Sequence, residues 1–97
     1  MVLGVCRVTI DLPEAHSLKD KRRVVKSVTE RVRNRFNVSI AEVDQLDVWQ
    51  SAGLAFVCVS NSTSHVDDTM QTVLRFIEGN LLGGYVADIH TEVIHIA

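Results

Sequence analysis

Residues 17–36 constrain the fold more than any other stretch, because their apolar side chains repeat at a helical spacing. A period of about 3.6 residues predicts an amphipathic helix of about five turns, roughly 27 Å long, with one buried side. Ser17 and Asp20 form an S-x-x-D start, where the hydroxyl accepts from an N–H group and the carboxylate faces the positive helix end. The apolar positions are Leu18, Val25, Val28, Val32 and Phe36, with Val24 beside them.

The same stretch concentrates the positive charge of the chain. It holds eight of the ten Lys and Arg residues and two acids, a formal charge of +6, whereas the other residues, with two cations and ten acids, carry −8. This asymmetry indicates an anionic partner, and arginine suits phosphate binding. A solvated helix face, balanced by the acids elsewhere in the chain, is the alternative. The predicted nucleic-acid-binding residues are Lys19, Arg22, Arg23, Lys26 and Arg33, flanked by Lys21, Arg31 and Arg35.

Four other segments have the composition of β-strands. Residues 2–12 alternate between apolar side chains on one face and a mixed set, including Arg7 and Thr9, on the other. Pro13 ends this strand because proline has no N–H group for a ladder. The other predicted strands are residues 37–44, residues 52–60, which are apolar on both faces, and residues 85–96.

A second helix is predicted between Ser64 and Gly79. Ser64 and Asp67 repeat the S-x-x-D start, and Gly79 is expected to end the helix in a left-handed conformation. Gly83 and Gly84 then turn the chain into the last strand. The predicted buried side consists of Val66, Met70, Val73, Leu74 and Ile77.

The order β-α-β-β-α-β predicts an α+β, ferredoxin-like sandwich that forms one domain over residues 1–97. Right-handed crossovers would place both helices on one face of a four-stranded antiparallel sheet of order 4-1-3-2. The other face of the sheet would be open. Apolar residues on an open face indicate an interface, so we expect a homo-oligomer. The predicted interface residues are Leu3, Val5, Val57 and Val59, with Trp49 in the connection after the second strand.

Other chemistries find weaker support. Residues 53–57 partly match an RNA-recognition strand, but with one aromatic residue, Phe56, which we assign to the core. The loop after the first strand lacks the arginine and glycine of an acylphosphatase, and the four histidines do not assemble by spacing. We therefore expect no enzyme, no cofactor and no metal. Cys6 and Cys58 are expected to be buried thiols of a cytoplasmic protein, and no apolar run is long enough for a membrane helix.

Residues 16–44 carry the run H-S-L-K-D-K-R-R, and residues 47–61 carry D-x-W-Q. With these two segments the chain resembles the YlxP-like family of small bacterial proteins of unknown function. The resemblance implies a ferredoxin-like fold, a cytoplasmic location, and gene neighbours that include translation initiation and ribosome-binding factors. It thereby favours RNA or the ribosome as the partner, and it implies no catalytic residues.

Overall fold

The computed structural model describes residues 1–97 and contains six regular elements. Their order is the predicted one, and each predicted boundary lies within two residues of the observed one. The elements are β1 (Val2–Asp11), α1 (Leu18–Arg35), β2 (Ser39–Asp44), β3 (Ser51–Ser60), α2 (Thr63–Gly79) and β4 (Tyr85–His95).

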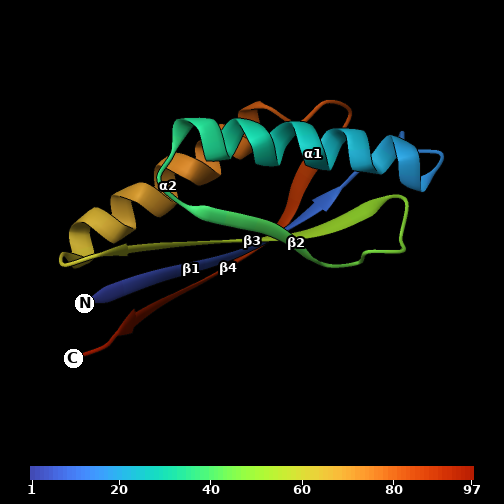
Figure 1. The fold of residues 1–97 in the computed structure, drawn as a ribbon. Helices are drawn as coiled ribbons and strands as arrows, with labels where there is room; N and C mark the ends of the chain where they lie inside the picture. The colour runs from blue at the N-terminus through green and yellow to red at the C-terminus, as the bar shows by residue number, and fades with distance from the viewer.

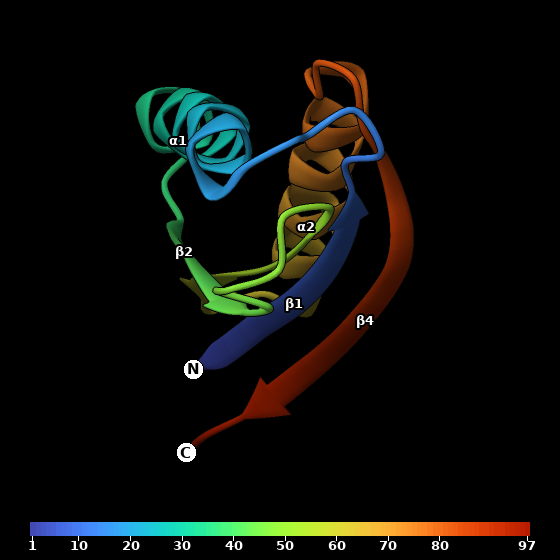
Figure 2. The same ribbon diagram turned by 90° about the vertical axis from the view of Figure 1, so that its right-hand side faces the viewer.

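The four strands form one antiparallel sheet in the order β2-β3-β1-β4, which is the predicted order read from the opposite edge. Both helices lie on one face of this sheet, and the other face is bare (Figures 1 and 2). The ferredoxin-like α+β architecture is therefore confirmed. Neither helix combines the length and the apolar character that a membrane crossing requires.

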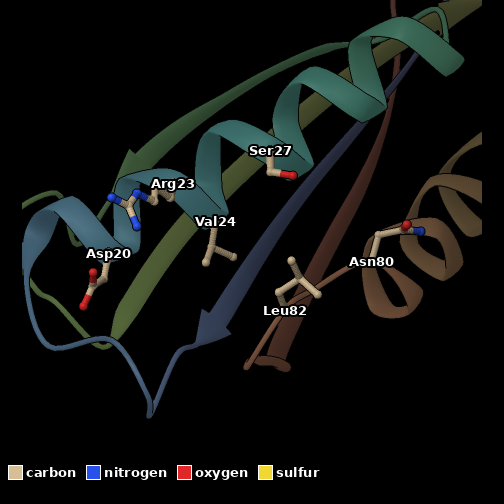
Figure 3. Close-up of a pocket in the computed structure, with 6 residues that line it drawn as sticks. All are labelled: Asp20, Arg23, Val24, Ser27, Asn80 and Leu82. Carbon is tan, nitrogen blue, oxygen red and sulfur yellow. The ribbon is translucent and has the colours of Figure 1, made fainter.

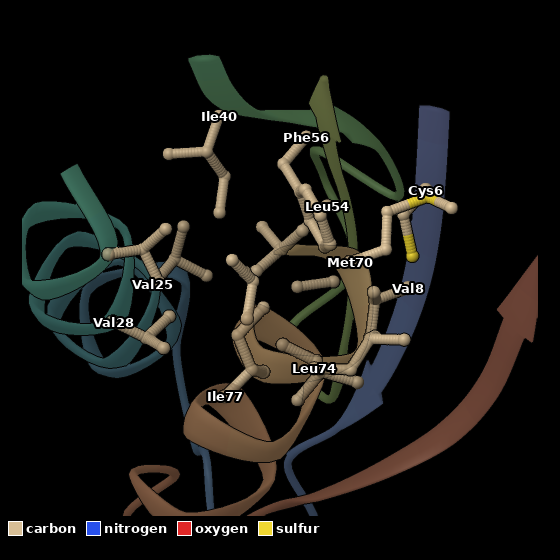
Figure 4. Close-up of a cluster of buried hydrophobic side chains, with 14 of the residues drawn as sticks. Cys6, Val8, Val25, Val28, Ile40, Leu54, Phe56, Met70, Leu74 and Ile77 are labelled. Atoms are coloured by element: carbon tan, nitrogen blue, oxygen red, sulfur yellow. The ribbon is translucent and has the colours of Figure 1, made fainter. Parts of the chain in front are cut away.

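The core fills the space between the helices and the sheet (Figure 4). Alternation in β1 buries Cys6, Val8 and Ile10 against the helices, whereas Arg7 between them is exposed on the open face. Phe56 on β3 is fully buried among these residues, which confirms its assignment to the core. A base-stacking role for Phe56 is thereby excluded, since the stacking of a base needs an accessible ring face.

Gly4 lets α2 approach β1 closely. A Cβ atom at this position would lie 2.5 Å from Val66 Cγ1 and 3.0 Å from Met70 Sδ, both on α2. Any larger side chain would therefore push the helix away from the sheet.

Three predicted helix ends can be compared with the structure. Ser17 caps α1 as predicted, because its side chain accepts a hydrogen bond from the N–H of Asp20. The prediction for α2 is wrong: its cap is Ser62, two residues before Ser64. Gly79 is also not left-handed, since Asn80 caps the C-terminus and donates its side-chain N–H to a carbonyl one turn back. Gly83, with φ of +72°, makes the turn expected there.

Candidate functional site

The eight cations of the basic stretch do not share one environment. Lys21 is fully buried, and the other seven are exposed. Helix α1 lies beside α2 on the covered face of the sheet (Figure 2). It buries its apolar residues there, so its exposed side carries nearly all of its charge. The exposed cations are Lys19, Arg22, Arg23, Lys26, Arg31, Arg33 and Arg35.

The prediction that Lys21 contacts phosphates is wrong. Its side chain is 0% exposed, and its Nζ donates to the carbonyls of Gln45 at 2.6 Å and Leu46 at 3.1 Å. A longer contact of 3.4 Å reaches the carbonyl of Ser51, and Glu42 Oε2 lies 3.0 Å away. Lys21 therefore fastens the β2–β3 loop to α1, because this ammonium group compensates a carboxylate and satisfies carbonyl groups of the loop.

Strand β2 supplies the carboxylate of this contact by ordinary alternation, because Glu42 lies two residues after the buried Ile40. A bulge follows, because the register of β2 against β3 shifts between Glu42 and Asp44, and this shift turns Asp44 to the open face. Asp44 there forms an exposed ion pair with Arg7 at 3.3 Å. Gly53 permits the bulge, since a Cβ on it would lie 2.5 Å from the Cβ of Asp44.

Two arginines in the second half of α1 bind groups of the protein itself. Arg33 Nη2 donates to the carbonyl of Ile40 on β2 at 2.8 Å. Arg31 Nη1 donates to the side chain of Asn80, which follows α2, at 3.3 Å. These two side chains hold α1 to its neighbours on both sides.

Arg35 is engaged in a different way. Its guanidinium carbon lies 5.2 Å from the ring centroid of Phe76 and 5.9 Å from that of Phe36. The two rings meet edge to face with centroids 5.4 Å apart. Arg35 thus covers the aromatic contact between α1 and α2, a cation–π arrangement.

Four cations in the first half of α1 have no partner in the protein, and we call them the basic patch: Lys19, Arg22, Arg23 and Lys26. None of these four side chains takes part in a hydrogen bond, an ion pair or a cation–π contact. Each lies three or four positions from two others, so the patch contains four neighbouring like-charge pairs. Such pairs destabilise a helix by about 0.2–0.5 kcal/mol each.

The acids of the chain do not neutralise the exposed cations of α1 by direct pairing. The protein contains two ion pairs within 4.0 Å, Arg7 with Asp44 and Lys21 with Glu42, and neither involves an exposed α1 cation. The negative charge that balances the chain lies on other elements, so the surface of α1 keeps its positive charge.

A hollow of about 240 Å³ lies beside the basic patch, between α1 and the chain that follows α2. Val24 on α1 and Leu82 on the opposite side face each other across it, and Arg23 and Asp20 lie at one end (Figure 3). A second hollow of about 190 Å³ shares Asp20, Val24 and Leu82 with the first. Together the two hollows form one groove, lined by both polar and apolar side chains, along the side of the patch that faces α2.

The predicted interface residues fall into two groups. On the open face Leu3 lies opposite Val59, and Val5 lies opposite Val57, so these four form one apolar cluster. Val59 is 62% exposed. Trp49 lies two residues before β3 begins, whereas Val59 lies near the other end of this strand, which is about 30 Å long. Trp49 therefore does not join this cluster.

The loop that carries Trp49 is held at both ends. Lys21 binds the carbonyls of residues at its start, and Gln50 Nε2 donates to the carbonyls of Pro13 and Ala15 at 3.1 and 3.4 Å. Sequence reasoning missed the roles of Lys21 and Gln50. The available signal was that each of the two specific runs supplies one of these side chains, Lys21 from K-D-K-R-R and Gln50 from D-x-W-Q.

Burial disfavours the thiolate form of both cysteines. Burial raises the pKa of Cys6 from 9.0 to about 11, and the neighbouring Cys58 adds to the effect. Burial also raises the pKa of Cys58, against a smaller opposing effect of a hydrogen bond from the backbone of Gly4. Both cysteines are buried and free, as predicted.

Comparisons with known proteins identify relatives of this chain. It is 38% identical over 77 residues to the "Uncharacterized protein YlxP" of Bacillus subtilis (strain 168), a match that covers 79% of this chain and 84% of the relative. Among solved structures, the designed protein Foldit4 matches all of both chains with a TM-score of 0.55 and 12% identity, which concerns the fold alone. The designed protein LFR1 1, described as having a ferredoxin fold, matches 97% of this chain and 84% of its own, with a TM-score of 0.48 and 15% identity. The model of the family described as "Protein of unknown function (DUF503)" matches residues 3–91, and the chain therefore belongs to this family.

Proposed function

We propose that this protein is a non-enzymatic module that binds RNA, free or within the ribosome, through the basic patch on α1. The observation that carries the proposal is the set of four exposed cations without any partner in the protein, next to three arginines that do have one. Phosphate groups are the partners that such cations bind, and each bound phosphate releases counterions.

The energetics of the helix support a role outside folding. The four like-charge pairs of the patch cost about 1–2 kcal/mol of repulsion, which Asp20 and Glu30, three or four positions from Arg23 and Lys26, offset only in part. A polyanion relieves this repulsion when it binds. The resemblance described above, with its implied cytoplasmic location and ribosome-related gene neighbours, adds associational support for RNA as that polyanion.

The test is the binding of a fluorescently labelled RNA as a function of salt. Four phosphate contacts predict a slope of about −3 for the logarithm of affinity against the logarithm of salt concentration on a single strand. The triple variant Arg22→Glu, Arg23→Glu, Lys26→Glu should lose binding and keep its fold by circular dichroism. Unchanged co-sedimentation of this variant with ribosomes and unchanged RNA affinity would refute the proposal.

Two matched single variants separate an effect on RNA binding from an effect on stability. Arg23→Glu and Arg75→Glu each reverse one exposed charge, but Arg75 lies on α2. Arg23→Glu replaces the repulsive pairs with Lys19 and Lys26 by attractive ones, but it also places a carboxylate three positions after Asp20. The net change is one pair, so the free energy of unfolding should stay unchanged or rise by less than about 1 kcal/mol. It should weaken RNA binding at least severalfold, whereas Arg75→Glu should not. A destabilised Arg23→Glu with full affinity would assign Arg23 a structural role.

The open sheet face supports a second candidate, a homo-oligomer or a protein or small-ligand interface. The observation in its favour is the apolar cluster around Val59, beside a hollow of about 260 Å³ lined by Leu3, Val57 and Val59 among others. Sedimentation equilibrium at tens of micromolar should show association that Val59→Lys abolishes. A monomer at that concentration would argue against self-association and leave the basic patch as the candidate.

A further inference from the structure

The β2–β3 loop presents the only tryptophan of the chain to solvent. Trp49 is 53% exposed, and its indole N–H donates no hydrogen bond within the protein. Large aromatic side chains are usually well covered, so a half-exposed indole in a well-fixed loop is unusual. Three further apolar side chains of the same hairpin are exposed: Val43, Leu46 and Val48.

Hydrogen bonds attach this loop to α1, the helix that carries the basic patch. The ammonium group of Lys21 holds the carbonyls of Gln45 and Leu46, and Lys21 lies in the sequence between the patch residues Lys19 and Arg22. The residue after Trp49 is fixed as well, since the carbonyl of Gln50 accepts from the N–H of Leu12 at 2.9 Å. Figure 1 shows the loop at the same end of the molecule as the start of α1.

The exposed indole therefore lies at the end of the molecule where α1 begins with its free cations, in a loop that hydrogen bonds fix to the same helix. Single-stranded nucleic acids are bound by this combination, in which cations follow the phosphates and an aromatic ring stacks on an unpaired base. A duplex offers phosphates but no accessible base face. We infer that the polyanion is single-stranded RNA, with phosphates on the basic patch and one base stacked on Trp49.

This inference rests on the proposed function and narrows it. If binding were only electrostatic, the affinities for single-stranded and duplex RNA would differ only because their charge densities differ. Stacking on Trp49 adds a preference for unpaired bases. The surrounding aliphatic side chains Leu46 and Val48 would contact the same base or its ribose and exclude water from the stack.

The sole tryptophan makes a direct test possible. Wild-type protein is titrated with a twelve-nucleotide oligouridylate and, separately, with a twelve-base-pair RNA duplex, and the intrinsic fluorescence is recorded. The single strand should quench the indole in step with binding measured by anisotropy, and the duplex should not. Binding without quenching would overturn the inference and leave the proposed function intact.

Substitutions give a second, independent readout. Loss of one stacked base on truncation to alanine corresponds to about 5- to 150-fold in affinity, so Trp49→Ala should weaken single-strand binding within that range. Trp49→Phe should retain most of the affinity, and duplex binding should not change. Val59→Ala is the control, because Val59 is similarly exposed (62%) but lies at the opposite end of β3 from Trp49, and this change should have no effect.

The remaining outcomes are also decisive. Equal losses for single strand and duplex in Trp49→Ala would refute stacking, and so would no loss in either. Fluorescence that changes with protein concentration without RNA would assign the indole to contact between protein copies and overturn the inference. If neither nucleic acid binds wild-type protein at low salt, the inference and the proposed function both fail.

Discussion

Replacing Lys21 with methionine tests the buried contact that joins α1 to the β2–β3 loop. Methionine keeps most of the length of the side chain and removes its charge. Glu42 then remains with a buried Oε2 that has no other hydrogen-bond partner. Removal of one partner of a buried ion pair costs about 3–5 kcal/mol, and the 17% exposure of the Glu42 side chain places the expected value near the lower limit. The loop carbonyls are close to solvent, so water replaces part of what they lose.

Urea unfolding measures this loss. With a slope of about 1–3 kcal/mol per molar urea, a loss of about 3 kcal/mol lowers the midpoint by roughly 1–3 M at an unchanged slope. Lys26→Met is the matched control, because it removes the same charge from the same helix at an exposed position, and it should change stability by about 0.5 kcal/mol at most.

The double variant Lys21→Met, Glu42→Leu should regain most of the loss, because a buried pair replaced by apolar groups leaves no uncompensated charge. This variant also provides a folded protein if the single change unfolds the chain. Should Lys21→Met be as stable as Lys26→Met, the assignment of Lys21 to the interior would be refuted. If Lys21→Met instead kept its stability but lost RNA affinity, Lys21 would belong to the binding surface.

Gly4→Ala should lower the free energy of unfolding by about 1–3 kcal/mol, because its Cβ would lie 2.5 Å from Val66 Cγ1, whereas Gly79→Ala, with nothing within 4 Å, should raise it by about 0.5–1 kcal/mol. If both variants shifted the urea midpoint in the same direction, this result would contradict the close approach of α2 to β1. Stability should fall as the pH rises from 9.0 towards about 11, because burial raises the pKa of Cys6 and the unfolded chain releases this proton first. Cys6→Ala should make the pH dependence shallower, and an identical dependence would show that Cys6 does not cause it. Sodium chloride should stabilise the wild type by screening the basic patch, and urea midpoints should show a smaller gain for Arg23→Glu; equal gains would argue against repulsion within the patch.

Local patterns were enough to predict the architecture. The alternation in β1 and the helical spacing of Val25, Val28 and Val32 each report which side of an element is buried, and this information depends on a few neighbouring residues. With the handedness of the crossovers, the order of the elements then leaves one sheet order. Phe56 could be assigned to the core for the same reason, since it continues the buried face of an apolar strand.

Ends of helices were predicted less well. Ser62 and Ser64 are chemically the same, and either can cap a helix by its composition. Which one does so depends on where β3 ends and how the chain leaves the sheet. That geometry is set by packing between elements, and a local pattern does not contain it.

The sequence by itself determined that a single helix carries nearly all the cations and that one side of this helix is buried. Lys21 even lies in the apolar row, four positions before Val25 and seven before Val28. Tertiary structure alone decided that this lysine is buried and its neighbours Lys19 and Arg22 are free. The physical reason is that a buried ammonium group needs acceptors, and here they come from the inward-facing carboxylate of Glu42 on β2 and from carbonyls of a loop more than twenty residues away along the chain.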